Sequence, residues 1–115
     1  MEGIQGVGGV DAERAAELIG EGAVFLDVRE PDEWEAGHAP QAVHVPLAAL
    51  VARLDELDPE REVVAVCRSG QRSQRAAVAL EQRGYRAHNL EGGMQAWAAA
   101  GFDVVTDAGE PGQVI

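Results

Sequence analysis

The chain has 115 residues, a length that suits one compact domain with a single hydrophobic core. Its net charge of -11, from nine basic and twenty acidic residues, would repel nucleic acid, so we expect no nucleic-acid partner. The sequence has neither a membrane-spanning apolar run nor a secretory signal, which favours a cytoplasmic protein without membrane contact. A lone cysteine excludes an internal disulfide and a multi-cysteine zinc site.

Apolar residues alternate between helical and strand spacing along the chain. Asp11 is placed to cap a helix over residues 12–22, and the apolar run 23–28 is typical of a strand buried on both faces. In a later helix, Ser73 is the expected cap and Gly84 the expected end. Further helices are predicted over residues 30–37, 47–57, 73–84 and 92–101, and further strands over residues 42–46, 61–67, 85–90 and 102–105.

Strands that alternate with helices predict an α/β domain, with a central, mostly parallel five-stranded sheet and helices on both faces. The composition of the two ends suggests that residues 1–9 and 107–115 are flexible, which leaves residues 10–106 as the folded domain. Ligands bind such sheets beyond the carboxyl ends of the strands. This rule points to two junctions, residues 27–30 and residues 67–73.

The segment CRSGQRS, residues 67–73, holds the only cysteine at the end of an apolar strand. A helix amino terminus, loop N–H groups and the charges of Arg68 and Arg72 all favour the thiolate, which is the nucleophilic form. Gly70 permits the tight backbone curl that turns N–H groups toward an anion. A buried cysteine is often core filler, but core filler does not need a glycine and two arginines in the next five residues.

Positive charge gathers around this cysteine. Residues 67–86 include five arginines and one acidic residue, in a chain that is otherwise strongly acidic. Such a basic island can hold a small anion. Arg75 and Arg83 lie on the predicted helix, where a solvated helix face explains them without a role in binding.

The spacing of cysteine and arginine indicates which anion is held. Cysteine-based phosphatases have five residues between the two, whereas four residues separate Cys67 from Arg72. A phosphate needs a ring of N–H groups wide enough for three oxygens, and a shorter loop closes more tightly around the sulfur itself. The pattern therefore favours a cysteine that carries one extra sulfur atom.

Three stretches, FLDVREPDEWEAGHAPQAVHVPL, VVAVCRSGQRSQRAAVAL and RGYRAHNLEGGMQAW, cover roughly residues 10–105 together with the helix before them. In these stretches the chain resembles the single-domain rhodanese family of sulfurtransferases and its three-layer fold. The family's usual GHIPGA reads GHAPQA here, with Ala39 and Gln41. The resemblance implies that Cys67 is the nucleophile. The expected substrate-binding residues are Arg68, Ser69, Gly70, Gln71, Arg72 and Ser73.

The resemblance further implies a thiosulfate sulfurtransferase. The Cys67 thiolate would take the outer sulfur of thiosulfate or a similar small anionic donor and become a persulfide, which passes the sulfur to cyanide or a thiol. Arg68 and Arg72 would attract the donor anion. No cofactor and no metal are expected.

Other functions remain possible on the sequence alone. The domain could be a persulfide carrier that delivers sulfur to a relay protein, with the same chemistry at Cys67. A cysteine phosphatase or arsenate reductase is disfavoured by the loop length, and an inactive regulatory module is disfavoured by the intact cysteine and loop.

Residues at the other junction are candidates for a supporting role. Asp27 and Arg29, with Glu30, could shape the site, but a structural ion-pair network that holds the thiol loop is the favoured interpretation. We interpret His38 as a hydrogen-bonded structural residue, because a thiolate with a lowered pKa needs no strong base.

Aromatic residues and glycines complete the prediction. Trp34 and Trp97 are predicted to anchor the core rather than to stack on a ligand. Gly92 and Gly93 open a helix and would let it approach the thiol loop closely.

Overall fold

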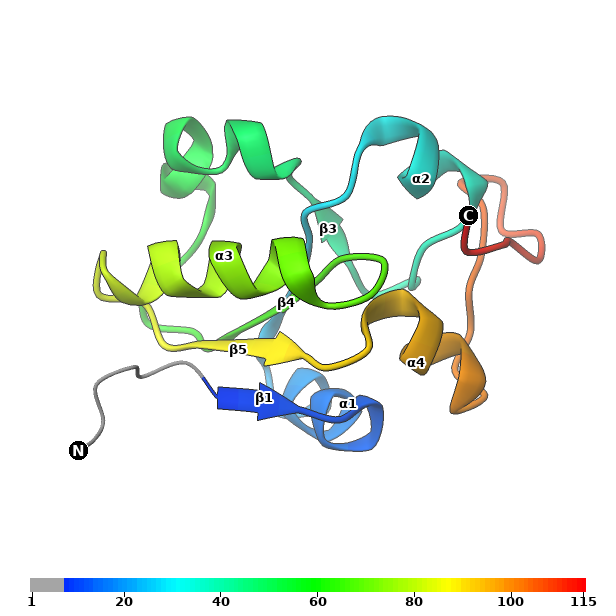
Figure 1. The fold of residues 1–115 in the computed structure, drawn as a ribbon, viewed down its shortest axis with the longest axis horizontal. Coiled ribbons are helices and arrows are strands. Elements are labelled where there is room, and N and C mark those ends of the chain that lie inside the picture. Colours follow the sequence, from blue (N-terminus) through cyan, green and yellow to red (C-terminus); the bar gives the residue numbers. More distant parts are fainter. Residues whose placement is uncertain (1–7) are drawn as a thin grey trace.

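In a computed structural model, which describes residues 8–115, the chain forms a five-stranded parallel sheet covered by helices on both faces (Figure 1). The strand order is β1-β5-β4-β2-β3, and every neighbouring pair is parallel. The predicted α/β fold class is therefore confirmed. The strands are β1 (Gly8–Val10), β2 (Val24–Asp27), β3 (Val43–His44), β4 (Val63–Val66) and β5 (Ala87–Leu90).

Helices form one layer on each side of the sheet. Helix α3 and the two 3-10 helices, η1 and η2, cover the face that carries Leu26, Val63 and Ala65. Helices α1 and α4 cover the opposite face, which carries Phe25 and Val64. The helices are α1 (Ala12–Gly20), α2 (Pro31–Ala36), η1 (Leu47–Ala49), η2 (Val51–Glu56), α3 (Gln71–Glu81) and α4 (Gly93–Ala99).

Strand β4 lies at the centre of the sheet, between β5 and β2. All four of its side chains are buried, and they alternate between the two faces as the period of a strand requires. Because Cys67 directly follows this strand, the rigid centre of the sheet fixes the position of the thiol.

The strands of the sheet differ from the prediction in two places. No strand forms over residues 102–105, where Val105 makes only isolated antiparallel bridges to His38 and Pro111. The fifth strand is instead β1, at the opposite end of the chain, and it includes residues 8 and 9 of the segment expected to be flexible. Residues 1–7 of that segment lie outside the described part. Backbone pairing with β5 supplies this strand, although its sequence is Gly-rich.

The single helix predicted over residues 47–57 is wrong. Two 3-10 helices occupy the segment, and the backbone leaves helical geometry at Arg53. The Leu57 N–H donates to the Leu54 carbonyl oxygen at 2.9 Å, a three-residue spacing that is typical of a 3-10 turn. The Tyr85 hydroxyl lies within hydrogen-bond distance of the carbonyl oxygens of Leu54 and Leu57 and joins the end of this segment to the rest of the fold.

The segment from residue 104 onward runs back along α2. The Gln113 N–H donates to the Ala36 carbonyl oxygen at 2.8 Å, and the Gly112 N–H donates to the Val104 carbonyl oxygen at 2.8 Å. The expected flexibility of residues 107–115 stays a prediction. Within residues 8–115, no helix has both the length and the apolar character needed to cross a membrane.

Candidate active site

Cys67 lies in the turn between β4 and α3, at the carboxyl end of the sheet. Only residues 68–70 separate it from α3, which begins at Gln71 rather than at Ser73. Gly70 is the residue that precedes the helix, and its φ of 113° is the left-handed conformation that favours glycine. The expected cap at Ser73 is wrong because this sharp turn starts the helix earlier. Ser73 therefore lies in the first turn of α3.

The sulfur of Cys67 is buried and surrounded by hydrogen-bond donors. The Gly70 N–H lies 3.1 Å from Sγ, and the Ser73 hydroxyl oxygen lies 3.3 Å from it. Burial by itself raises the pKa of the Cys67 thiol, but the Ser73 hydroxyl and the backbone N–H groups of Ser73, Gly70 and Ser69 outweigh burial and lower it. The site therefore favours a thiolate, which is the reactive form.

The amino terminus of α4 holds the thiol loop from the side. The N–H groups of Met94 and Gln95 donate to the carbonyl oxygens of Cys67 and Arg68, at 2.8 and 3.2 Å. A Cβ atom on Gly93 would lie only 2.5 Å from the backbone of Arg68. The predicted close approach of this helix is confirmed. In a trans peptide the carbonyl oxygen and the N–H point in opposite directions. Because the carbonyl oxygens of Cys67 and Arg68 point toward α4, the N–H groups of the same peptides point away from α4.

Asn89 is a buried residue of the site that the sequence analysis missed. Its side-chain N–H donates to the Gly70 carbonyl oxygen at 3.1 Å, and its side-chain oxygen accepts from the Ser73 hydroxyl at 2.6 Å. Ser73 has one hydroxyl hydrogen, so Asn89 and the Cys67 sulfur share it. An asparagine within the strand segment AHNL was the available signal, because a buried amide needs partners.

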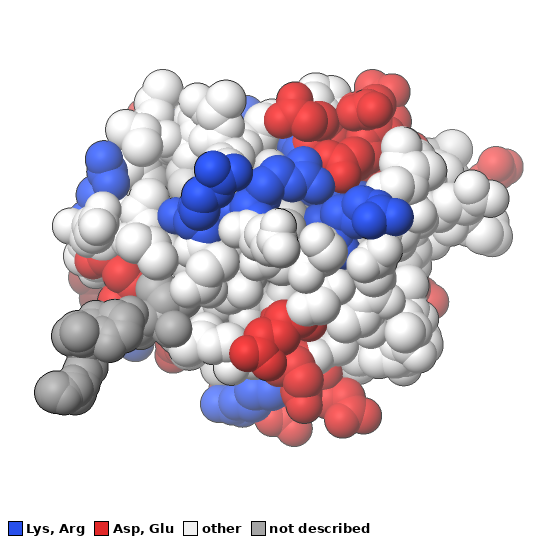
Figure 2. Space-filling view, in the orientation of Figure 1, with Lys and Arg blue, Asp and Glu red and all other residues white. Residues whose placement is uncertain are grey.

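The loop arginines point to different partners. Arg68 is exposed, and its Nε donates to the Ile115 carbonyl oxygen at 2.9 Å. Arg72 forms a two-bond ion pair with Glu33, with N–O distances of 2.7 and 2.8 Å. Basic side chains form a band across the face over α3, next to a group of acidic side chains (Figure 2). Of the remaining loop residues, Ser69 and Gln71 are exposed.

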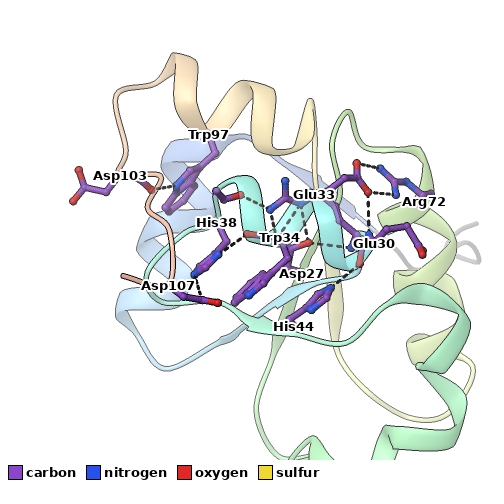
Figure 3. A network of polar contacts seen from close by, with 12 residues as sticks. Asp27, Glu30, Glu33, Trp34, His38, His44, Arg72, Trp97, Asp103 and Asp107 are labelled. Carbon is purple, nitrogen blue, oxygen red and sulfur yellow. Dashed lines mark hydrogen bonds and ion pairs between the residues drawn. The ribbon is translucent and has the colours of Figure 1, made fainter. Parts of the chain in front are cut away.

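Asp27 and Arg29 form a fully buried ion pair at the other junction (Figure 3). Arg29 Nη2 lies 2.8 Å from Asp27 Oδ2 and donates a second bond of 2.8 Å to the Gly37 carbonyl oxygen. The expected ion pair is thus present, but it holds the end of α2 rather than the thiol loop. Glu30 caps α2, in a reciprocal capping box with Glu33.

His38 is buried beside Trp34. Its Nδ1 lies 2.8 Å from the Trp34 carbonyl oxygen, its ring stacks on the indole with centroids 3.6 Å apart, and its Nε2 lies 3.4 Å from Asp107. A second ring, of His44, stacks on the same indole (Figure 3). Trp97 is fully buried in the core as predicted, whereas the prediction for Trp34 is wrong, because it packs between two histidines.

Possible metal ligands are dispersed in the structure. Among residues 8–115, no three histidine, cysteine or carboxylate side chains are grouped so that they could hold a metal ion. The arrangement at Cys67 instead offers a sulfur nucleophile, oriented N–H donors and a neighbouring helix amino terminus. These groups suit nucleophilic attack and the stabilisation of a small anion.

Comparison with known proteins identifies the family of the chain. The family model of the rhodanese-like domain matches residues 11–100. The chain belongs to the rhodanese-like domain family. A sulfurtransferase of Allochromatium vinosum is 37% identical in an alignment of 103 residues, and the match covers 87% of this chain and 96% of the relative. The thiosulfate sulfurtransferase GlpE of Pseudomonas syringae is 34% identical over 89 residues, 76% of this chain and 84% of the relative.

Solved structures show the same rhodanese-like fold. The crystal structure of a rhodanese-related protein from Thermoplasma volcanium has a TM-score of 0.81 and 30% sequence identity, and it covers 87% of this chain and 99% of its own. Together with the sequence relatives, this likeness supports sulfurtransferase activity in general for this rhodanese-like domain.

Proposed function

We propose that the domain transfers sulfane sulfur from thiosulfate or a similar anionic donor to a thiophilic acceptor, with Cys67 as the carrier. The observation that carries the proposal is the position of the Cys67 sulfur, 3.1 Å from the Gly70 N–H and 3.3 Å from the Ser73 hydroxyl at the start of α3. Donors in this arrangement stabilise a negative charge on sulfur before and after transfer. The lowered pKa of Cys67 supplies the thiolate.

In the first half-reaction, the Cys67 thiolate attacks the outer sulfur of thiosulfate. A sulfur–sulfur bond forms at Cys67, the sulfur–sulfur bond of thiosulfate breaks, and sulfite leaves with the bonding electron pair. The outer sulfur of the resulting persulfide is anionic, and the loop N–H groups and the amino end of α3 stabilise it. Arg68 follows Cys67 in the loop and is exposed, and its charge attracts the donor.

In the second half-reaction, an acceptor attacks the outer sulfur of the persulfide. Cyanide leaves as thiocyanate, and a thiolate leaves as a new persulfide, while the electron pair returns to Cys67 as a thiolate. In each step a neutral sulfur atom passes from one nucleophile to another, so the donor and the acceptor balance the electrons and no resident cofactor or metal is required. One cysteine is sufficient because the acceptor comes from outside.

Two other functions can be distinguished from this proposal by the reactions that they predict. A persulfide carrier for a relay protein would load Cys67 from thiosulfate but release sulfur slowly to cyanide and quickly to its protein partner. A phosphatase would hydrolyse para-nitrophenyl phosphate, which the four-residue spacing of Cys67 and Arg72 disfavours. A phosphatase rate above the transferase rate would overturn the proposal.

The decisive test is the mass of the purified protein after incubation with thiosulfate. We expect an increase of one sulfur atom, located on Cys67 and removed by cyanide with release of thiocyanate. Cys67→Ser and Cys67→Ala should show neither the mass increase nor turnover. A full rate in either variant, or an unmodified wild-type cysteine under turnover conditions, would show that Cys67 is not the carrier.

A further inference from the structure

Arg72 is the loop arginine whose charge is already neutralised. It lies in the first turn of α3, and both of its terminal nitrogens bind the two carboxylate oxygens of Glu33, which belongs to α2 (Figure 3). This two-bond arrangement is the one a guanidinium uses to bind planar and tetrahedral oxyanions. Glu33 therefore takes one N–H of each terminal nitrogen and neutralises the charge with which Arg72 would bind the sulfonate of a sulfur donor.

Glu33 is held in this position by its own helix. Its Oε1 also accepts a 2.9 Å hydrogen bond from the Glu30 N–H, as part of the capping box of α2. Only 14% of the Glu33 side chain and 31% of the Arg72 side chain are exposed. The pair is thus a built contact between two helices rather than a flexible surface pair.

The charge on Glu33 persists at neutral pH. The hydrogen bonds from Arg72 are the main cause that lowers the pKa of Glu33, to about 2. Glu33 is the main cause that raises the pKa of Arg72, and the Cys67 thiolate makes a smaller contribution. Protonation cannot free Arg72 under ordinary conditions, and an anionic donor must compete with the Glu33 carboxylate.

We propose that Glu33, acting through Arg72, selects sulfur donors by their charge and disfavours dianions. This inference rests on the proposed function and names the donor class of the same site. While Glu33 neutralises Arg72, the guanidinium adds little net attraction for an anionic donor. The attraction that is lost is larger for a dianion such as thiosulfate than for a monoanionic thiosulfonate or an organic persulfide. The favoured donors therefore carry one negative charge or none.

Two donors with the same chemistry and different charge test this selection. Thiosulfate is a dianion and releases sulfite, and methanethiosulfonate is a monoanion and releases methanesulfinate. In both reactions the Cys67 thiolate attacks the outer sulfur and the donor's sulfur–sulfur bond breaks. The measurement is kcat and KM for each donor, with cyanide as the acceptor.

The variant is Glu33→Gln, which keeps an oxygen for the Glu30 N–H and removes the charge. We expect the KM for thiosulfate to fall about 5- to 10-fold, as the loss of a partly exposed ion pair allows, and the KM for methanethiosulfonate to fall by less than about 3-fold. In each case kcat should change little. Glu35→Gln is the matched control, since Glu35 lies on α2, is exposed and has the same charge.

Arg72→Gln completes a double-mutant cycle with Glu33→Gln. If Glu33 acts through Arg72, the Glu33→Gln effect on the ratio of the two KM values should disappear in the Arg72→Gln background. If the effect persists there, or if Glu35→Gln has an equal effect, the loss of any negative charge on α2 changes donor binding without Arg72. Either result would overturn the inference.

The failure of the inference is distinguishable from the failure of the proposed function. If both donors load Cys67 and Glu33→Gln leaves the ratio of KM values unchanged or raises the KM for thiosulfate, donor selection by Glu33 is wrong and the transferase proposal stands. If neither donor adds sulfur to wild-type Cys67, the proposed function is wrong and the inference is overturned with it.

Discussion

The backbone N–H of Met94 donates a 2.8 Å hydrogen bond to the carbonyl oxygen of Cys67. This bond joins the amino end of α4 to the residue that carries the thiol, and it sets the direction of the Cys67 peptide group. The neighbouring bond from Gln95 to Arg68 does the same for the next peptide group. Helix α4 contributes no side chain to the reaction that we propose, but it orients the loop that carries it.

Gly93→Ala should therefore destabilise the domain and slow sulfur transfer. The new Cβ would meet the backbone of Arg68 at 2.5 Å, at a residue with a φ of 61°. We expect a loss of about 3 kcal/mol or more in the free energy of unfolding, measured with urea. Gly101→Ala is the control, because Gly101 also has a positive φ but its Cβ would meet no atom within 4 Å. A loss no larger than that of the control would contradict the steric argument.

Ser73→Ala should raise the pKa of Cys67. The Ser73 hydroxyl is the largest of the contributions that lower this pKa against the opposing effect of burial. The rate of alkylation by iodoacetamide, measured against pH, should shift its midpoint to higher pH and fall at neutral pH, where less thiolate is present. Gln74→Ala, an exposed substitution on the same helix, is the control. An unchanged midpoint in Ser73→Ala would show that backbone N–H groups alone set the pKa.

Asp27→Ala should cost much more stability than breaking an exposed pair. It leaves the Arg29 charge buried without its carboxylate partner, and loss of one partner of a buried pair costs about 3–5 kcal/mol. Glu56→Gln, which breaks the exposed pair with Arg53, should change stability little. Urea denaturation of both variants gives the comparison. Equal effects would mean that Arg29 finds a new partner or water.

The Glu33→Gln variant should be less stable than the wild type at pH values at which Glu33 is charged, and equally stable at pH values at which Glu33 is protonated. The pKa of Glu33 is lowered from 4.5 to about 2 by Arg72, so the folded state favours the carboxylate. This contribution is complete above pH 4.5 and disappears as the pH falls through about 2. The difference in free energy of unfolding between the two proteins should thus shrink across that range. A difference that does not depend on pH would locate the effect in packing.

The sequence predicts much of the sheet because apolar runs are long and strongly patterned. Strand β4 is apolar throughout and β2 is apolar up to Asp27, and the thiol follows β4 directly. Strand β1 could not be predicted, because Gly8 and Gly9 carry no pattern and join the sheet through the backbone alone. Strand pairing at an edge depends on which segment reaches it, and this is a property of the whole fold.

The candidate site also has a part that the sequence predicts and a part that it does not. The cysteine, the turn glycine and the helix that follows are adjacent in sequence, so their arrangement could be derived locally. The partners of the loop come from distant segments: Asn89 from β5, Glu33 from α2 and Ile115 from the end of the chain. Arg72 was therefore expected to face a donor, whereas the structure has it bound to a carboxylate.

The order of strands in the sheet has a consequence for synthesis. Strand β1 leaves the ribosome first among the strands, but it pairs only with β5, which is the last strand made, through Gly8 and His88, Gly9 and Asn89, and Val10 and Leu90. A nascent chain that ends before Ala87 has no partner for it. Closure of this edge must wait until almost the whole sheet exists, and such distant pairing slows folding. Strand β1 can therefore become ordered in the sheet only after β5 has been translated.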